Sequence, residues 1–289
     1  MSERSSDVES RIGAVHQLSI VISAMRGIAA ARSREARARL DGVRAHAAII
    51  AGAIAQALGQ LPQVGPGQSV PIAGNRHVVI ALCAEQGFAG VFSERILDHA
   101  QTVTTAAARQ GHTSELLIVG DRGVMVAQQR DLSFGWSAAM VEHADQATTL
   151  ANRLADELYD RLRQDNLADV TLIHAMPNAA AALDIVERRL LPFDFDRFPA
   201  ATAPVAPIIT LPPRQLLARL SEEYVFAELC EALVLSLAAE NEARTRAMIA
   251  AKTNVAKTLD GLVSRSRQLR QEEITNEIIE LASGASAPR

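Results

Sequence analysis

A seven-residue repeat near the N-terminus constrains this chain more than any other feature. Seven successive positions one heptad apart are all apolar: Val15, Ile22, Ala29, Ala36, Val43, Ile50 and Ala57. On a straight helix, positions seven residues apart drift gradually around the helix axis. An apolar row that keeps this spacing therefore predicts a long helix that supercoils on a partner helix. The positions three residues further on are polar in the middle, at Arg32, Arg39 and His46. A uniform dimeric zipper would not show that interruption.

The same interval recurs near the C-terminus, at Met248, Val255, Leu262 and Leu269. Both ends also lack the strongest helix breaker, because every proline except Pro288 lies between positions 62 and 213. All ten aromatic residues lie between positions 88 and 226, so the ends must pack with aliphatic and small side chains. We expect two long helices, residues 1–60 and 213–287, that pack on each other as an antiparallel coiled coil.

The middle of the chain reads as an α/β domain. Short β-rich runs alternate there with helical stretches, and this alternation predicts a mostly parallel, Rossmann-like sheet over residues 72–195. Residues 196–212 are rich in proline and are expected to form an irregular connection to the C-terminal helix. The runs are 77–83, 115–120 and 169–175, and the helical stretches are 92–109 and 145–164.

No catalytic, cofactor or metal site is expected from the motifs. The turn after the first predicted strand, Glu85 to Gly90, is not the GxGxxG of a dinucleotide site. A P-loop is excluded because the only two lysines, Lys252 and Lys257, each follow alanine where the motif requires glycine. The two cysteines and seven histidines show no metal-ligand spacing, and no GxSxG elbow occurs. A Rossmann-like nucleotide-binding enzyme remains an alternative on fold class alone.

Charge separates the ends from the middle. Residues 1–60 and 244–289 each carry a net charge of +3, and the segment between them carries −10. Basic ends attract acidic partners, but no aromatic residues interleave the arginines as a nucleic-acid surface needs, so no nucleic acid is expected. The longest apolar stretch, residues 47–55, is too short to span a bilayer. An assembly role, with a coiled-coil adaptor as one alternative, fits these features.

The two ends resemble the γ subunit of F-type ATP synthases. The C-terminal match runs without a gap over about 45 residues, and the first helix matches an AMxxVAA-like core. The C-terminal residues that carry it are Glu240 to Arg244, Ala247, Met248, Asn254, Arg270, Gln271, Ile274, Thr275, Glu277 and Ser283 to Ala285. Those in the first helix are Arg11, Ile12, Val15, Ala24, Met25 and Ile28 to Ala30.

This resemblance implies a fold and a function. The terminal helices would form an antiparallel coiled coil inside a hexamer of α and β subunits. The α/β domain would sit at the foot, against the ε subunit and the c-ring. The chain would be the rotating, non-catalytic central stalk that couples ion flow to ATP synthesis or hydrolysis. It would lie at the cytoplasmic side of a bacterial inner membrane, as a peripheral component without a cofactor of its own.

The resemblance also implies roles for individual residues. Arg270 and Gln271 match an Arg-Gln pair that hydrogen-bonds a loop of the β subunit, and guanidinium geometry suits a carboxylate. Met25 matches a methionine near the same region of β. Glu277 belongs to the same C-terminal signature and is assigned to this partner surface.

Some positions depart from the family pattern. Ser23, Arg267 and Glu85 stand where lysine, asparagine and aspartate are usual, and residues 209–211 replace the foot segment that meets the c-ring. These departures favour the hypothesis of a divergent paralogue, of the N-type ATPase kind.

Overall fold

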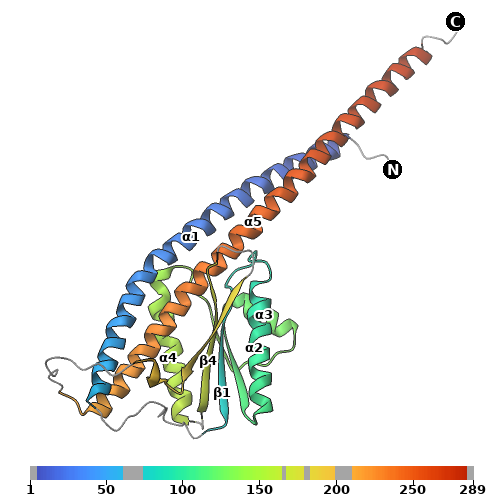
Figure 1. Cartoon of the computed structure of the whole chain (residues 1–289). Coiled ribbons are helices and arrows are strands. Elements are labelled where there is room, and N and C mark those ends of the chain that lie inside the picture. Colours follow the sequence, from blue (N-terminus) through green and yellow to red (C-terminus); the bar gives the residue numbers. More distant parts are fainter. Residues whose placement is uncertain (1–4, 61–73, 165–166, 179–182, 199–209, 285–289) are drawn as a thin grey trace. The chain divides into compact units, whose positions relative to one another are not determined.

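The computed structural model describes residues 5–60, 74–164, 167–178, 183–198 and 210–284. In sequence order, the two long helices α1 and α5 flank five strands, three shorter α-helices and two short 3-10 helices (Figure 1). Their bounds agree closely with the two long helices expected from the repeats. The elements are α1 (Ser5–Gly59), β1 (Arg76–Leu82), α2 (Phe92–Arg109), β2 (Thr113–Val119), α3 (Asp121–Gln129), β3 (Trp136–Ala138), α4 (Ala147–Gln164), β4 (Leu167–Met176), β5 (Asp184–Leu191) and α5 (Pro213–Gly284).

The five strands form one sheet in the order β3-β2-β1-β4-β5. The first four strands are parallel, and β5 runs antiparallel to β4 at the edge. The expected mostly parallel sheet is therefore confirmed, together with the α/β fold class. Sequence reasoning missed β5 because its residues, DIVERRLL, lack the continuous apolar run of a strand that is buried on both faces.

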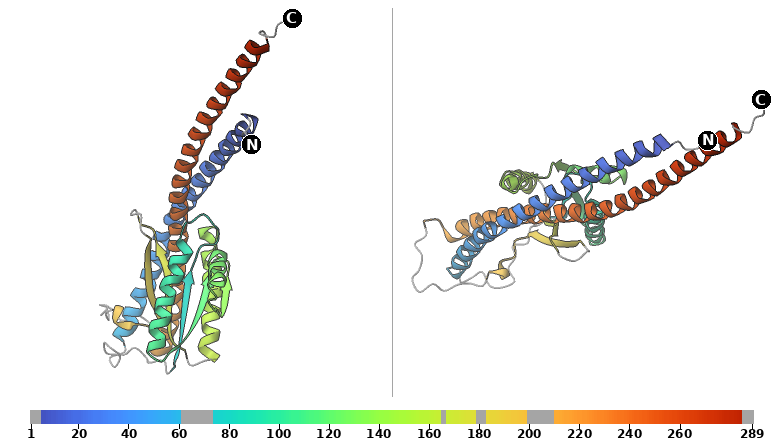
Figure 2. Two further views of the ribbon diagram at one scale, coloured as in Figure 1. Left: turned by 90° about the vertical axis from the view of Figure 1, so that its right-hand side faces the viewer. Right: turned by 90° about the horizontal axis from the view of Figure 1, so that it is seen from above.

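Helices cover both faces of the sheet. Alternate strand residues such as Val78, Ile80 and Leu82 lie in one core with α4 and with parts of α1 and α5. Their neighbours Val79 and Ala81 lie in a second core with α2 and α3. The two views of Figure 2 show the same arrangement around the sheet. The period of two along β1 thus builds a three-layer α/β unit.

The chain divides into two compact units, and the boundary between them crosses both long helices. One unit is residues 30–243, and the other combines residues 1–29 with residues 244–289. The sequence instead predicted segment boundaries at the ends of the long helices, with the segments 1–60, 72–195, 196–212 and 213–287. By packing, however, the second half of α1 and the first half of α5 belong with the sheet, because their apolar side chains enter its core.

The seven heptad positions of α1 all turn inward. Five of the seven are buried, and Val15 and Val43 are half-buried. The second row of buried positions lies four residues further on, at Ser33, Leu40 and Ile54, whereas Arg39 and His46 are exposed. Arg32, the third polar position, is half-buried, and its guanidinium lies 3.5 Å from the carboxylate of Glu142. The polar middle noted in the sequence therefore does not interrupt the buried seam.

Within residues 30–243, α1 and α5 run antiparallel. Arg37 forms an ion pair with Glu242, Arg44 pairs with Glu231 at 2.8 Å, and His46 lies 3.3 Å from Glu223. As numbers rise along α1, those of its partners fall along α5. This is the direction that the sequence predicted for the coiled coil.

Strand β5 and the segment after it are both tied to α5 through a buried carboxylate. The carboxylate of Glu228, 3% exposed, accepts hydrogen bonds from Arg188 at 2.9 Å and from Arg197 at 2.7 Å. Nearby, the rings of Phe193 and Phe198 stack at 5.5 Å. Residues 199–209 of the predicted irregular connection lie outside the described residues, including Ile209 of the departing foot segment.

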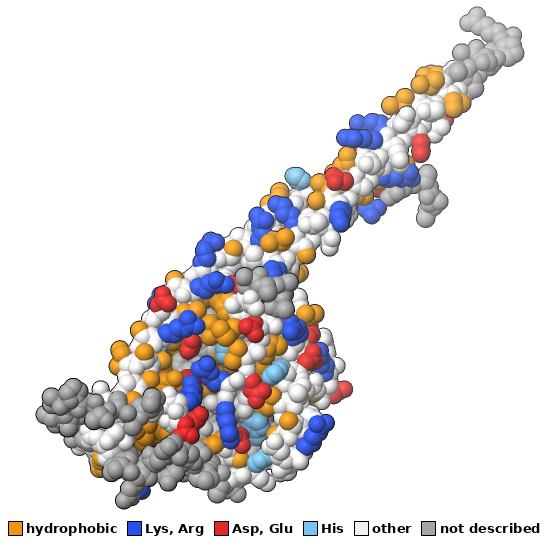
Figure 3. Space-filling model, in the orientation of Figure 1, with side chains coloured by type: hydrophobic (Ala, Val, Ile, Leu, Met, Phe, Trp, Pro, Cys, Tyr) orange, Lys and Arg blue, Asp and Glu red, His pale blue; other side chains and the backbone are white. Residues whose placement is uncertain are grey.

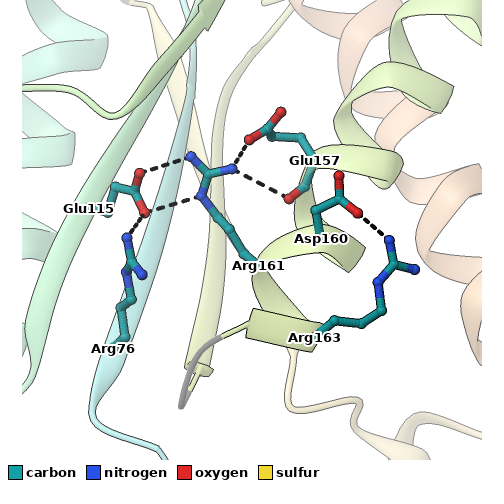
Figure 4. A network of polar contacts seen from close by, with 6 residues as sticks. All are labelled: Arg76, Glu115, Glu157, Asp160, Arg161 and Arg163. Atoms are coloured by element: carbon teal, nitrogen blue, oxygen red, sulfur yellow. Dashed lines mark hydrogen bonds and ion pairs between the residues drawn. The ribbon is translucent and has the colours of Figure 1, made fainter.

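A partly buried polar network joins the starts of β1 and β2 to α4 (Figure 4). Arg161 donates two hydrogen bonds to Glu115, at 2.8 and 3.1 Å, and Arg76 donates a third at 2.6 Å. Arg161 also pairs with Glu157 on its own helix. Hydrogen bonds from Arg161, the largest cause, and the charges of both arginines hold the pKa of Glu115 below its usual value.

Glu115→Gln is expected to destabilise the chain by about 1–2 kcal/mol, because Arg76 and Arg161 lose a shared charged acceptor. The contribution of wild-type Glu115 is present above pH 4.5 and is lost as the pH falls below that value, since its folded pKa is lowered. Urea unfolding at pH 7 and at pH 3.5 measures both effects. The matched control is Asp160→Asn, since Asp160 and Arg163 form an exposed pair that contributes little. Equal losses in the two variants would contradict a special role for Glu115.

Candidate partner surface on the helical ends

The unit made by residues 5–29 and 244–284 holds all four residues that the sequence assigned to a partner surface. Its two helices pack through buried side chains at heptad spacing, Val8, Ile22 and Ala29 on α1 and Met248 and Leu269 on α5. Val8 extends the α1 seam one heptad toward the N-terminus, which the sequence reasoning did not use. These apolar contacts orient the charged residues beside them.

Arg270 is held by a residue that the sequence reasoning missed. Its Nη2 donates to Oε1 of Glu9 at 2.8 Å, and the two side chains are 66% and 52% exposed. Glu9 directly follows the buried Val8, and charges that flank a seam commonly pair across a coiled coil. The heptad extended to Val8 would have found it. Such an exposed pair contributes at most about 1 kcal/mol, so Arg270 can exchange Glu9 for another carboxylate at small cost.

The other assigned residues occupy different parts of the unit. Gln271 and Glu277 are exposed, and the backbone carbonyl of Gln271 accepts the hydroxyl of Thr275 at 2.8 Å. Met25 is half-buried on α1, sixteen residues after Glu9, which is about 24 Å along a helix. The structure therefore brings Arg270 to Glu9 and leaves Met25 at a separate position.

Large apolar side chains are exposed along both helical ends. Every residue from Arg270 to Leu281 is exposed, so this stretch of α5 is not covered by the described part of the chain. Figure 3 shows hydrophobic and basic side chains alternating along these helices. Apolar exposure on this scale marks an interaction surface. The exposed residues are Leu18, Ile20, Val21, Ile28, Ile249, Ile274, Ile278, Ile279 and Leu281.

By length and composition alone, α1 also qualifies as a membrane span. An 18-residue window within Ser6–Gly59 has a mean hydropathy of 1.3, and 11% of it is buried. Many helices of soluble proteins pass the same test. Because the seam positions of α1 pack on other parts of this chain, we interpret its apolar residues as coiled-coil and partner contacts.

The turn at residues 85–90 bears on the nucleotide-binding alternative. Oε2 of Glu85 accepts the backbone N–H of Asp121 at 3.2 Å, at the start of α3, and that of Met140 at 2.6 Å. A helix N-terminus is where a phosphate would bind in such a fold. The phosphate site of a dinucleotide-binding fold is the N-terminus of the helix that follows β1, which is α2 here, whereas Glu85 occupies the N-terminus of α3. Glu85 therefore ties the turn after β1 to the turns after β2 and β3 and does not itself decide the nucleotide-binding alternative. Among the described residues, no group of three His, Cys, Asp or Glu residues is arranged to hold a metal ion.

Comparisons with known proteins agree with this architecture. A family model described as ATP synthase matches residues 4–287. The ATP synthase gamma chain of Paracoccus denitrificans is 28% identical, over 97% of this chain and 98% of the relative. That of Solibacter usitatus is 27% identical, with the same shares covered.

Solved structures show the same fold at low sequence identity. A chain of the Euglena gracilis mitochondrial ATP synthase, in a structure of its OSCP, F1 and c-ring parts, has a TM-score of 0.68 at 10% identity. The match covers 99% of this chain and 97% of that one. A second structure, of the rotor of the same synthase, has a TM-score of 0.61, over 93% and 98% of the two chains. The match over nearly the whole sequence, together with the paired terminal helices around an α/β unit, shows that the chain belongs to the ATP synthase gamma-chain family.

Proposed function

We propose that this gamma chain turns within a ring of ATP synthase α and β subunits and couples ion flow through a c-ring to ATP synthesis or hydrolysis. The observation that carries the proposal is the uncovered run from Arg270 to Leu281, with Ile274, Ile278 and Leu281 exposed on α5. Isolated apolar helix surface of this kind is stabilised by a surrounding partner. The relatives' shared name, ATP synthase gamma chain, supports other subunits of an ATP synthase as that partner.

The remaining assignments follow the same proposal. The foot, residues 72–195, would contact the ε subunit and the c-ring, and residues 196–212 would connect it to the helix 213–287. The helix 1–60 would pair with that helix as the shaft. The chain would lie peripherally at the cytoplasmic side of a bacterial inner membrane. It would have no catalytic site, cofactor or nucleic-acid partner of its own.

Copurification separates this proposal from the alternatives. The tagged full chain, isolated from its own cells and analysed by mass spectrometry, is expected to bring down the α and β subunits in stoichiometric amounts. A cofactor-binding enzyme would bind its nucleotide when purified alone, and an adaptor would copurify with other proteins. Recovery of the chain without α and β subunits would overturn the rotor assignment.

We also propose that Met25, Arg270, Gln271 and Glu277 contact β subunits. Arg270 supports this most directly, because its exposed pair with Glu9 leaves the guanidinium accessible to a second carboxylate. Gln271 and Glu277 are exposed on the same stretch of α5. Met25 presents a flexible apolar side chain that can slide past acidic loops without forming an ion pair.

Met25→Lys is expected to impair coupling, because an added ion pair with an acidic β loop would have to break at each rotational step. A pair of about 1.4 kcal/mol would slow such a step about tenfold. The measurement is ATP-driven ion pumping relative to ATP hydrolysis in vesicles that contain the whole complex. Met25→Leu is the matched control and should pump normally. Normal pumping by Met25→Lys would show that Met25 does not face the β subunit.

A further inference from the structure

A pocket of about 370 Å³ lies between the second half of α2 and strands β1, β4 and β5. It belongs to the unit of residues 30–243 and includes none of the residues of the partner surface. Polar side chains, five of them titratable, line it together with Val103, Ala106 and Ala107. The lining residues that matter here are His77, His112, Asp169, Thr171, Glu187 and Arg189. Figure 3 shows histidine side chains among acidic and basic ones on this face of the sheet unit.

The histidine at the floor of the pocket is buried and hydrogen-bonded. His77 on β1 is 8% exposed, and its Nε2 lies 2.8 Å from the hydroxyl of Thr171 on β4. His112, just before β2, is half-buried, and its Nδ1 has no hydrogen-bond partner within the described part of the chain. A third histidine, His99 on α2, lies 3.3 Å from Oε2 of Glu187 on β5. Three histidines therefore lie where α2 packs against the strands of the sheet.

The charged and titratable groups around His77 come from β4, β5 and the turn before β2, whereas the α2 residues that line the pocket are uncharged. Asp169 on β4 and Glu187 on β5 favour its protonated form, while His112 and Arg189 oppose it. Asp169 also forms an ion pair with Arg189, and it has the largest of the charge effects on the pKa of His77. Burial is the largest influence and lowers the pKa of His77 below 6.5.

We propose that this histidine pocket is a proton-responsive joint: it holds the second half of α2 on β4 and β5 while His77 is neutral, and it opens when His77 takes up a proton. A protonated His77 has to regain hydration, and the cavity beside it is where water can enter. The inference does not depend on the rotor assignment.

The opening is expected to be local. The first half of α2 is anchored by Ile96, Leu97 and Ala100, each fully buried. In the second half, Val103 and Ala107 are the buried residues, and both line the pocket. Residues 101–112 therefore have the weaker attachment and should separate first.

The contact between His99 and Glu187 acts in the opposite direction. When protonated, His99 gains a full ion pair that draws α2 toward β5. Its side chain is 35% exposed and that of Glu187 is 49% exposed, and pairs this exposed contribute little to stability. The joint opens on acidification only where the loss of hydration at the buried His77 exceeds this gain.

Hydrogen exchange of the full-length chain at pH 7.5 and pH 5.5, corrected for the intrinsic pH dependence of exchange, tests the joint. Protection of residues 101–112 and 184–191 is expected to fall several-fold at pH 5.5, while β2 stays protected. His77→Gln keeps an amide near the position of Nε2 and should abolish the pH response. The matched control is His143→Gln, an exposed histidine in the loop after β3, which should retain it.

A titration of the wild-type chain covers the case in which His77→Gln fails to fold. The histidine carbon resonances, followed by NMR, should include one assigned to His77 that titrates below pH 6.5. Titration of His77 at pH 6.5 or above would overturn the proposal. Unchanged protection of residues 101–112 at pH 5.5, or an undiminished pH response in His77→Gln, would overturn it as well.

Discussion

Ile54→Ala is expected to lower the free energy of unfolding of the sheet unit by about 3 kcal/mol. Ile54 lies on α1, is fully buried, and belongs to the core that includes Leu154 of α4 and Leu172 of β4. The substitution removes buried methyl groups and leaves a cavity that close-packed neighbours fill only partly. Urea unfolding of the full-length chain measures the loss.

The same helix offers a matched control. Ile49 lies five residues earlier on α1 and is 73% exposed, so Ile49→Ala should change the free energy of unfolding by less than about 0.5 kcal/mol. The pair of variants tests whether this end of α1 belongs to the sheet unit or only to the coiled coil. Similar small effects for Ile54→Ala and Ile49→Ala would show that α1 does not share the core of the sheet.

Acidification from pH 7 to pH 4 is expected to lower the free energy of unfolding by about 3 kcal/mol through the protonation of His174 alone. His174 on β4 is 3% exposed, and burial lowers its pKa from 6.5 to about 4. The nearby Arg188 on β5 lowers the pKa further, while a hydrogen bond to the carbonyl of Ala175 and the charge of Glu231 on α5 partly oppose the shift.

The direction of this effect follows from proton uptake. The unfolded chain binds a proton at His174 below pH 6.5, whereas the folded chain resists binding down to about pH 4. Stability is therefore full above pH 6.5 and falls as the pH drops toward 4, by about 1.4 kcal/mol per unit of pKa difference.

A pH series of urea unfolding compares wild type with His174→Asn, which should show a flatter dependence between pH 6.5 and 4.5. The exposed His143→Asn should follow wild type. This window lies above that of Glu115, so the two contributions can be separated. An equally steep decline in His174→Asn would place the acid sensitivity elsewhere.

The long helices and the fold class could be predicted because they depend on local pattern. The α1 seam repeats every seven residues, and all seven of its positions are buried or half-buried. The second row of buried positions on α1 could not be placed from the sequence. Residues three and four positions after a seam residue both lie beside the seam on a helix. Packing selected the row with Leu40 and Ile54 over the row with Arg39 and His46. The edge strand β5 was missed because edge strands carry charges that hide their pattern.

The four residues of the partner surface were assigned from the resemblance to a known family and not from a physical feature of the sequence. Nothing in the spacing of Met25, Arg270, Gln271 and Glu277 distinguishes them from other polar or apolar helix positions. The structure adds Glu9 as the partner of Arg270 and shows that Met25 lies apart from it. Their contacts with β subunits remain predictions.

The sequence by itself determined two long helices, a mostly parallel α/β middle and the family, because periodicity, proline placement and terminal signatures are all local features of the chain. Only the tertiary structure decided which halves of α1 and α5 join the sheet, where Glu85 directs its carboxylate, and that His77, Asp169 and Glu187 line one pocket. Those three pocket residues lie on β1, β4 and β5, more than a hundred positions apart at the extremes. Strand order brings them together, and strand order is set by the packing of the whole unit rather than by any short segment.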